Sequence, residues 1–250
     1  MAGSDSLNPI NPLPSLTEVL SFAPGDLGLT VDWVLQGQGA DPDALRVRRP
    51  RLVDMARQAL AEGLTLIQPR AALLRLPVEV LSHQRLTFQG GGWLAGQAVG
   101  QHLAGAREAT VMVYSAGSRL EARIQSLMAS DLPYALALDG VGTAAIDALG
   151  GLIYHQLEEQ AAANGWQVSI LLSPGMMGWS VEEGQPQIFR LIDAARIGVR
   201  INPAWVMIPR KSTSGVVGAG PGLVPAQGLP CEFCALQGTC RYQGRHTHDS

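Results

Sequence analysis

The chain has 250 residues, of which 46% are hydrophobic and 16% charged, and it carries a formal net charge of -3. The apolar fraction is too high and the charged fraction too low for a disordered protein, and the length suits one large domain or two small ones. Because there is no basic excess, a general nucleic-acid binder or a binder of anionic membranes is not favoured.

Residues 1–30 contain no lysine or arginine, although secretory signals and mitochondrial presequences both carry basic residues. No apolar stretch approaches the roughly 18 residues that a membrane-spanning helix needs. We therefore expect a cytoplasmic protein whose partners include neither nucleic acid nor a membrane.

The N-terminal half is expected to begin with an irregular lead-in over 1–30, because prolines and glycines interrupt it. Apolar spacing over 50–63 predicts an amphipathic helix, with Gly63 at its C′ position. β-branched residues over 110–114 predict a buried strand. The other elements expected here, in chain order, are a short helix over 16–22, a strand over 64–68, a turn at 90–92 and a helix from there to 103.

In the C-terminal half, Ser118 and Glu121 predict a capping box for a helix that reaches about Met128. The longest helical pattern covers 142–164 and is closed by Asn164-Gly165. The other elements expected here, in chain order, are strands over 134–138 and 167–172, a helix over 187–196, and strands over 204–208 and 215–217. Uneven alternation of strands and helices favours a mixed α/β or α+β domain followed by a cysteine tail.

All three cysteines, Cys231, Cys234 and Cys240, lie within ten residues of one another near the C-terminus. An odd count at this spacing argues against a disulfide framework, and a C-x-x-C turn brings two thiolates to one side. Three thiolates suit an iron–sulfur cluster with one other ligand, or a zinc ion completed by His246 or His248. The spacing does not choose between zinc and iron, and clustered free thiols are the alternative.

Two turns rich in glycine and serine each follow a predicted strand. In the segment 173–179, glycines would let a ligand approach the backbone closely. In the segment 209–215, small hydroxyls and Lys211, the only lysine of the chain, would suit an anion or a ribose. Both segments also fit an ordinary turn or a solvated loop. We find no acid–base pair and no nucleotide-binding fingerprint, so no catalytic residue is assigned.

Several motifs occur in a fixed order: Ser173-Pro174-Gly175, an amphipathic helix, Ile197-Gly198-Val199, and Met207-x-Pro209-x-x-Ser212-x-Ser214-Gly215. Together they resemble the activation (reactivation) domain of vitamin B12-dependent methionine synthase. The resemblance is closest to small stand-alone proteins that carry this domain with a cysteine-rich tail. It covers roughly residues 30–220, and its two serine-containing loops are more specific as an ordered pair than singly.

The resemblance implies an α+β fold over 31–222, with a twisted, mainly antiparallel sheet and flanking helices, between the lead-in and a metal- or cluster-binding tail over 223–250. In the family this domain binds S-adenosylmethionine in a shallow groove and sits over the corrinoid during reductive methylation of cob(II)alamin. The positions that correspond to this groove, together with Lys211 as the candidate for an anionic ligand group, are Ser173, Pro174, Gly175, Met176, Lys211, Ser212, Ser214 and Gly215.

Two departures from the family pattern Arg-x-Ala/Ser-Pro-Gly-Tyr matter. Leu171 stands where the arginine belongs, so charge-assisted hydrogen bonds worth about 1.5–3 kcal/mol each are lost, and Met176, where the tyrosine belongs, lacks the aromatic hydroxyl. We also expect no corrinoid-binding domain in this sequence: His102 and Gly105 match the His-x-x-Gly of the cobalamin motif, but Gly100 stands where its aspartate belongs. Cobalamin would therefore come on a separate corrinoid protein.

We carry two hypotheses forward. The first is an accessory protein of corrinoid-dependent methyl transfer, whose cysteine tail holds an electron-relaying iron–sulfur cluster. The second is a non-catalytic binding module that kept the fold, lost S-adenosylmethionine binding, and uses the tail as a structural zinc clasp. A methyltransferase acting by itself is the weakest interpretation, since it needs a general base or an activated nucleophile.

Overall fold

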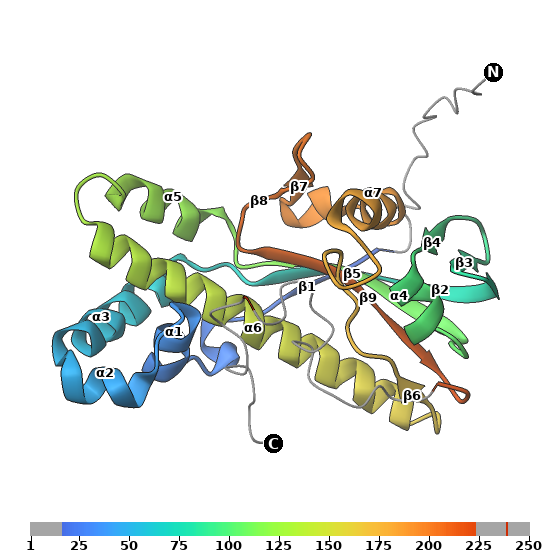
Figure 1. The fold of residues 1–250 in the computed structure, drawn as a ribbon, viewed down its shortest axis with the longest axis horizontal. Helices are drawn as coiled ribbons and strands as arrows, with labels where there is room; N and C mark the ends of the chain where they lie inside the picture. The colour runs from blue at the N-terminus through green and yellow to red at the C-terminus, as the bar shows by residue number, and fades with distance from the viewer. Residues whose placement is uncertain (1–16, 224–238, 240–250) are drawn as a thin grey trace.

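The structure is a computed structural model that describes residues 17–223 and Thr239. Its centre is a sheet in which neighbouring strands run antiparallel, in the order β4-β3-β2-β5-β9-β6, with β1 also pairing with β2 (Figure 1). The expected α+β fold with a mainly antiparallel sheet and flanking helices is confirmed. The strands are β1 Glu18–Ser21, β2 Arg70–Ser82, β3 Arg85–Phe88, β4 Trp93–Ala95, β5 Glu108–Ser115, β6 Gln167–Val168 and β9 Ser212–Gly220, and a separate hairpin joins β7 Arg200–Ile201 to β8 Met207–Ile208.

The helices divide between the two faces of this sheet. The long helix α6 crosses one face together with α1 and α3, and α7 lies on the other face (Figure 1). In chain order the α-helices are α1 Val31–Gly37, α2 Pro42–Arg48, α3 Pro50–Leu66, α4 Gln97–His102, α5 Ser118–Leu127, α6 Leu132–Ala162 and α7 Val181–Leu191, and two 3₁₀ helices are η1 Pro24–Leu27 and η2 Ala194–Ile197.

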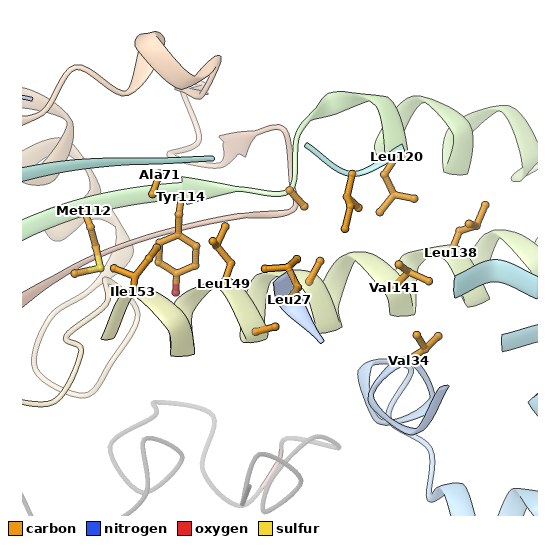
Figure 2. Close-up of a cluster of buried hydrophobic side chains, with 14 of the residues drawn as sticks. Leu27, Val34, Ala71, Met112, Tyr114, Leu120, Leu138, Val141, Leu149 and Ile153 are labelled. Carbon is orange, nitrogen blue, oxygen red and sulfur yellow. The ribbon is translucent and has the colours of Figure 1, made fainter. Parts of the chain in front are cut away.

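Alternation along the central strands sends side chains to two separate hydrophobic cores, as the pleat of a strand requires. Figure 2 shows Met112 and Tyr114 of β5 facing Leu149 and Ile153 of α6, all of them buried. On the opposite face, the next residue along β5, Val113, belongs to a second cluster that includes α7. The sheet therefore separates two sides of the molecule, an α6 side and an α7 side. The direction in which a strand side chain points determines in which of the two hydrophobic cores it packs.

α6 is apolar around much of its circumference. Among the residues that the structure describes, it is the one helix long and apolar enough to cross a membrane by length and composition, contrary to our expectation that no apolar stretch reaches that length. Of its most apolar window, 56% is buried inside the fold. α6 packs between the sheet and α1, so much of its apolar surface contributes to the core of the fold (Figure 2).

Several predicted elements are wrong near the N-terminus. The helix expected over 16–22 is strand β1, so the second half of the expected lead-in forms part of the sheet and the 3₁₀ helix η1. Gly63 does not end a helix, and the strand expected after it does not exist, because α3 continues to Leu66. A Cβ atom on Gly63 would lie 2.6 Å from Val141 Cγ1, so the missing side chain serves the close contact of α3 with α6.

Two further corrections concern α5 and α6. The strand expected over 134–138 is the beginning of α6, where the Asp131 side chain accepts a hydrogen bond from the Tyr134 amide at 3.2 Å. Ser118 and Glu121 form no capping box, because Gly117 is the N-cap of α5. The Glu121 carboxylate instead accepts a hydrogen bond from the backbone N–H of Arg210 at 2.9 Å.

Candidate functional site

The turn that follows Leu172 is held by its own backbone. The Gly175 amide donates to the Trp179 carbonyl at 2.8 Å, and the Met176 amide donates to the Ser173 carbonyl at 3.1 Å. Gly175 has φ 102°, in the region that favours glycine. Trp179 is buried against α7, so this half-buried turn stands on a packed base.

The turn meets β9 at Gly215. Leu172 and Val216 exchange two backbone hydrogen bonds, each 2.9 Å long. A Cβ atom on Gly215 would lie 2.6 Å from Leu171 Cδ1, 2.7 Å from the Leu172 carbonyl oxygen and 3.2 Å from Ser173 Oγ. The structure therefore brings together the two loops that the sequence singled out, and their role in binding a ligand stays a prediction.

The two predicted serines of β9 are buried and engaged inside the protein. The Ser212 hydroxyl lies 2.7 Å from the Pro209 carbonyl oxygen and 2.9 Å from the Ser115 hydroxyl. The Ser214 hydroxyl donates to the Gln185 side chain of α7. Both serines thus fix the start of β9 and its contact with α7, and a ligand would have to displace these partners to use the hydroxyls.

Lys211 does not join the other predicted residues. Its Nζ lies 2.9 Å from Asp139 Oδ1 and 2.9 Å from Thr143 Oγ1, both on α6. Ser214 contacts α7, so the two side chains lie on opposite sides of the sheet. The turn at 173–176 therefore receives no cation from Lys211, contrary to our expectation.

The two residues that depart from the family pattern have internal contacts. Leu171 packs against the hydrophobic core on the α6 side, and the Met176 sulfur accepts a hydrogen bond from the Ser173 amide at 3.2 Å. Four cavities of 460 to 660 Å³ are lined by described residues, and none of them is lined by the turn at 173–176 or by Ser212, Ser214 or Gly215. This site is therefore a surface turn, which offers a ligand backbone groups and no charge of its own.

The proposed metal ligands Cys231, Cys234 and Cys240 lie outside the described residues, as do His246 and His248. Within the part of the chain that the structure describes, no group of three or more metal-binding side chains comes together. The metal site therefore stays a prediction.

A polar cluster that the sequence analysis missed joins α3, α5 and α6. The Arg123 Nε donates to Glu62 Oε1 at 2.6 Å, and the Tyr134 hydroxyl donates to Glu62 Oε2 at 2.8 Å. The Arg123 hydrogen bond, followed by that of Tyr134, lowers the pKa of Glu62, and burial together with Glu62 raises the pKa of Tyr134 to about 12. Glu62 and Tyr134 are 72 residues apart, so no local pattern could have indicated the contact.

The chain resembles known proteins in its fold. No protein-family model matches the sequence, and no curated protein matches it. Among 13 matching chains of solved structures is the crystal structure of the MetH reactivation domain bound to AdoHcy, with a TM-score of 0.64 and 13% sequence identity. The match covers 86% of this chain and 82% of that chain. The resemblance expected from the sequence is confirmed at the level of the fold.

Proposed function

We propose that this protein is a cytoplasmic accessory protein of corrinoid-dependent methyl transfer, which acts on a separate corrinoid protein. The observation that carries the proposal is the match of 86% of the chain to a reactivation domain, at a TM-score of 0.64. The contact of Ser173, at the start of the turn, with Gly215 of β9 supports the proposal further, because an S-adenosyl site built from these two loops needs them side by side.

The ligand in this proposal is S-adenosylmethionine or S-adenosylhomocysteine, held by the turn at 173–176 beside Ser212, Ser214 and Gly215. The AdoHcy bound to the structurally similar MetH reactivation domain supports this choice. The backbone of the turn fits such a ligand, but Leu171 supplies no charge. One missing charge-assisted hydrogen bond costs about 1.5–3 kcal/mol, which corresponds to an affinity about 10- to 140-fold lower.

The tail completes the proposal. An iron–sulfur cluster at Cys231, Cys234 and Cys240 would relay the single electron that cob(II)alamin needs before it accepts a methyl group. Three cysteinyl ligands leave one position for another ligand, and zinc suits the same thiolates. Cobalamin itself would arrive on the partner corrinoid protein.

The alternative function is a non-catalytic binding module with a structural zinc tail. It is favoured by the contacts of the two departing residues, since Leu171 packs in a hydrophobic core and Met176 bonds to Ser173. In this alternative the turn is a structural corner that retains no S-adenosyl ligand.

Calorimetric titration of S-adenosylmethionine and S-adenosylhomocysteine separates the two. We expect weak, saturable binding to the wild type and about two- to tenfold tighter binding to Met176→Tyr, which restores a hydroxyl within the turn itself. The matched control is Met128→Tyr at the end of α5, at a side chain that is already 52% exposed, and it should leave the affinity unchanged. If neither the wild type nor folded Met176→Tyr binds either compound, the alternative function holds.

Anaerobic purification followed by an absorption spectrum and metal analysis tests the tail. Broad visible absorbance with about four irons per chain supports a [4Fe–4S] centre and the electron-relaying role. Stoichiometric zinc without colour supports the structural clasp, and a colourless protein without iron removes the electron relay.

A further inference from the structure

A cavity of 520 Å³ is lined by residues of α5 and α6 and by Arg210 and Lys211, which precede β9. It belongs to the α6 side of the sheet, because Lys211 reaches it and bonds to Asp139 and Thr143 of α6. Its volume is in the range of small-molecule sites, about 300–1,000 Å³. It shares none of its lining residues with the turn at 173–176.

The polar lining holds both signs of charge. Arg210 and Lys211 provide two cations, and Glu121 and Asp139 provide two carboxylates. Lys211 is already paired with Asp139 at 2.9 Å. Arg210 gives its backbone N–H to Glu121, and its guanidinium forms no ion pair with any residue in the described part of the chain. A ligand with one positive and one negative group complements this balance better than a simple anion does.

The cation of Lys211 is held in place by the helix beneath it. A Cβ atom on Gly142 of α6 would lie 2.8 Å from Lys211 Cγ and 3.0 Å from both Cδ and Cε, so the lysine stem rests where a side chain is missing. Glycine inside a helix is unfavourable relative to alanine, so this position serves the contact with the lysine. The opposite wall, α5, is fixed by the hydrogen bond of Arg123 to Glu62.

The other end of the cavity is apolar and open. Met128 and Leu136 line it, and each is 52% exposed. Ile124 lies in the same wall. A methionine side chain adapts to ligands of different shape, and an apolar group placed here would remove these side chains from water.

We propose that this cavity binds a free α-amino acid with an apolar side chain. The ligand carboxylate pairs with the Arg210 guanidinium, which can accept it in a bidentate geometry. The ammonium group faces the carboxylates of Asp139 and Glu121, and the side chain covers Met128 and Leu136. The site goes beyond the proposed function, since it involves neither the S-adenosyl turn nor the cysteine tail.

The single lysine makes the site directly observable. Protein grown with ¹³C-labelled lysine gives signals from Lys211 alone, without any chemical modification. Titration with L-leucine and L-methionine should shift its ε-CH₂ signal along a saturable curve, with a Kd of about 1 mM for such small ligands. Arg210→Gln should weaken the binding at least tenfold, and the control Arg190→Gln, at another exposed arginine, should leave it unchanged.

Two analogues test each charge separately. N-acetyl-L-leucine lacks the ammonium group and L-leucinamide lacks the carboxylate, and each should bind at least tenfold more weakly than L-leucine. Absence of a saturable shift with both amino acids up to about 20 mM, well above the expected Kd, would overturn the proposal. Equal binding of either analogue would overturn it as well.

Discussion

Gly215 is the position where β9 touches the turn at 173–176, and one added methyl group there should destabilise the protein. In Gly215→Ala the new Cβ would lie 2.6 Å from Leu171 Cδ1 and 2.7 Å from the Leu172 carbonyl oxygen. Ordinary contacts between carbon atoms are about 3.5–4.0 Å. The Leu172 carbonyl cannot move freely, because it accepts a hydrogen bond of 2.9 Å from Val216.

Overpacking of this kind costs about 1–3 kcal/mol, while alanine gains about 0.5–1 kcal/mol over glycine inside a strand. Two contacts under 3.0 Å, one of them with a backbone oxygen, put the overpacking cost in the upper half of its range, about 2–3 kcal/mol, so we expect Gly215→Ala to lower the free energy of unfolding by about 1–2.5 kcal/mol. The matched control is Gly151→Ala on α6, where an added Cβ meets nothing within 4 Å and should stabilise by about 0.5–1 kcal/mol. Urea unfolding followed by tryptophan fluorescence measures both, and a Gly215→Ala protein as stable as the wild type would refute the reasoning.

Three further predictions concern the α6 side. Arg123→Gln should lower stability by less than about 1 kcal/mol near pH 7 and by a smaller amount near pH 3. The reason is that the Arg123 hydrogen bond holds the pKa of Glu62 below its ordinary 4.5. The stabilisation of the fold by this hydrogen bond is therefore present above pH 4.5 and is lost as the pH falls through the folded-state pKa of Glu62. Urea unfolding at both pH values checks the difference. Leu149→Ala, at a fully buried side chain, should cost about 2–5 kcal/mol in the same assay. Gly142→Ala should displace the stem of Lys211 and shift its NMR signal, and an unchanged signal would contradict the contact.

Elements with a regular hydrophobic period could be predicted from the sequence. The segment 110–114 is the centre of β5, and 50–63 is most of α3. The long strand β2 is not among the elements predicted from the sequence, and Pro77 in its middle is a residue that argues against a strand. The structure tolerates this proline where β2 changes partner, since β2 pairs with β5 up to Pro77 and with β3 from Val78, beside a bulge.

The sequence at the beginning of α6 contains a helix-start signal, although the apolar pattern there predicts a strand. A run of apolar residues over 134–138 looks like a short strand, because a helix buried on most sides has no clear period. The capping aspartate Asp131 and Pro133 in the first turn indicate a helix start instead. Residues 134–138 are helical because they belong to α6, which is buried against the rest of the fold.

The candidate site was predictable in part. The contact of Gly215 with the turn follows from the order of the family motifs. The direction of the Lys211 side chain could not be predicted from the sequence. Neighbouring residues along a strand point to opposite faces of the sheet, and the sequence does not say which face carries the ligand. Glu121, Asp139 and Arg210, which line the cavity beside Lys211, come from three separate segments of the chain, so no local sequence spacing could predict the cavity.

The most direct test of the central claim is a titration of ¹⁵N-labelled protein with S-adenosylhomocysteine, followed at the backbone amides. We predict that the Gly175 and Gly215 amides shift together along one saturable curve, while the Gly151 amide, on α6, stays unchanged. Absence of any saturable shift at these two amides would contradict the assignment of the turn at 173–176 as an S-adenosyl site, and with it the proposed role in corrinoid-dependent methyl transfer.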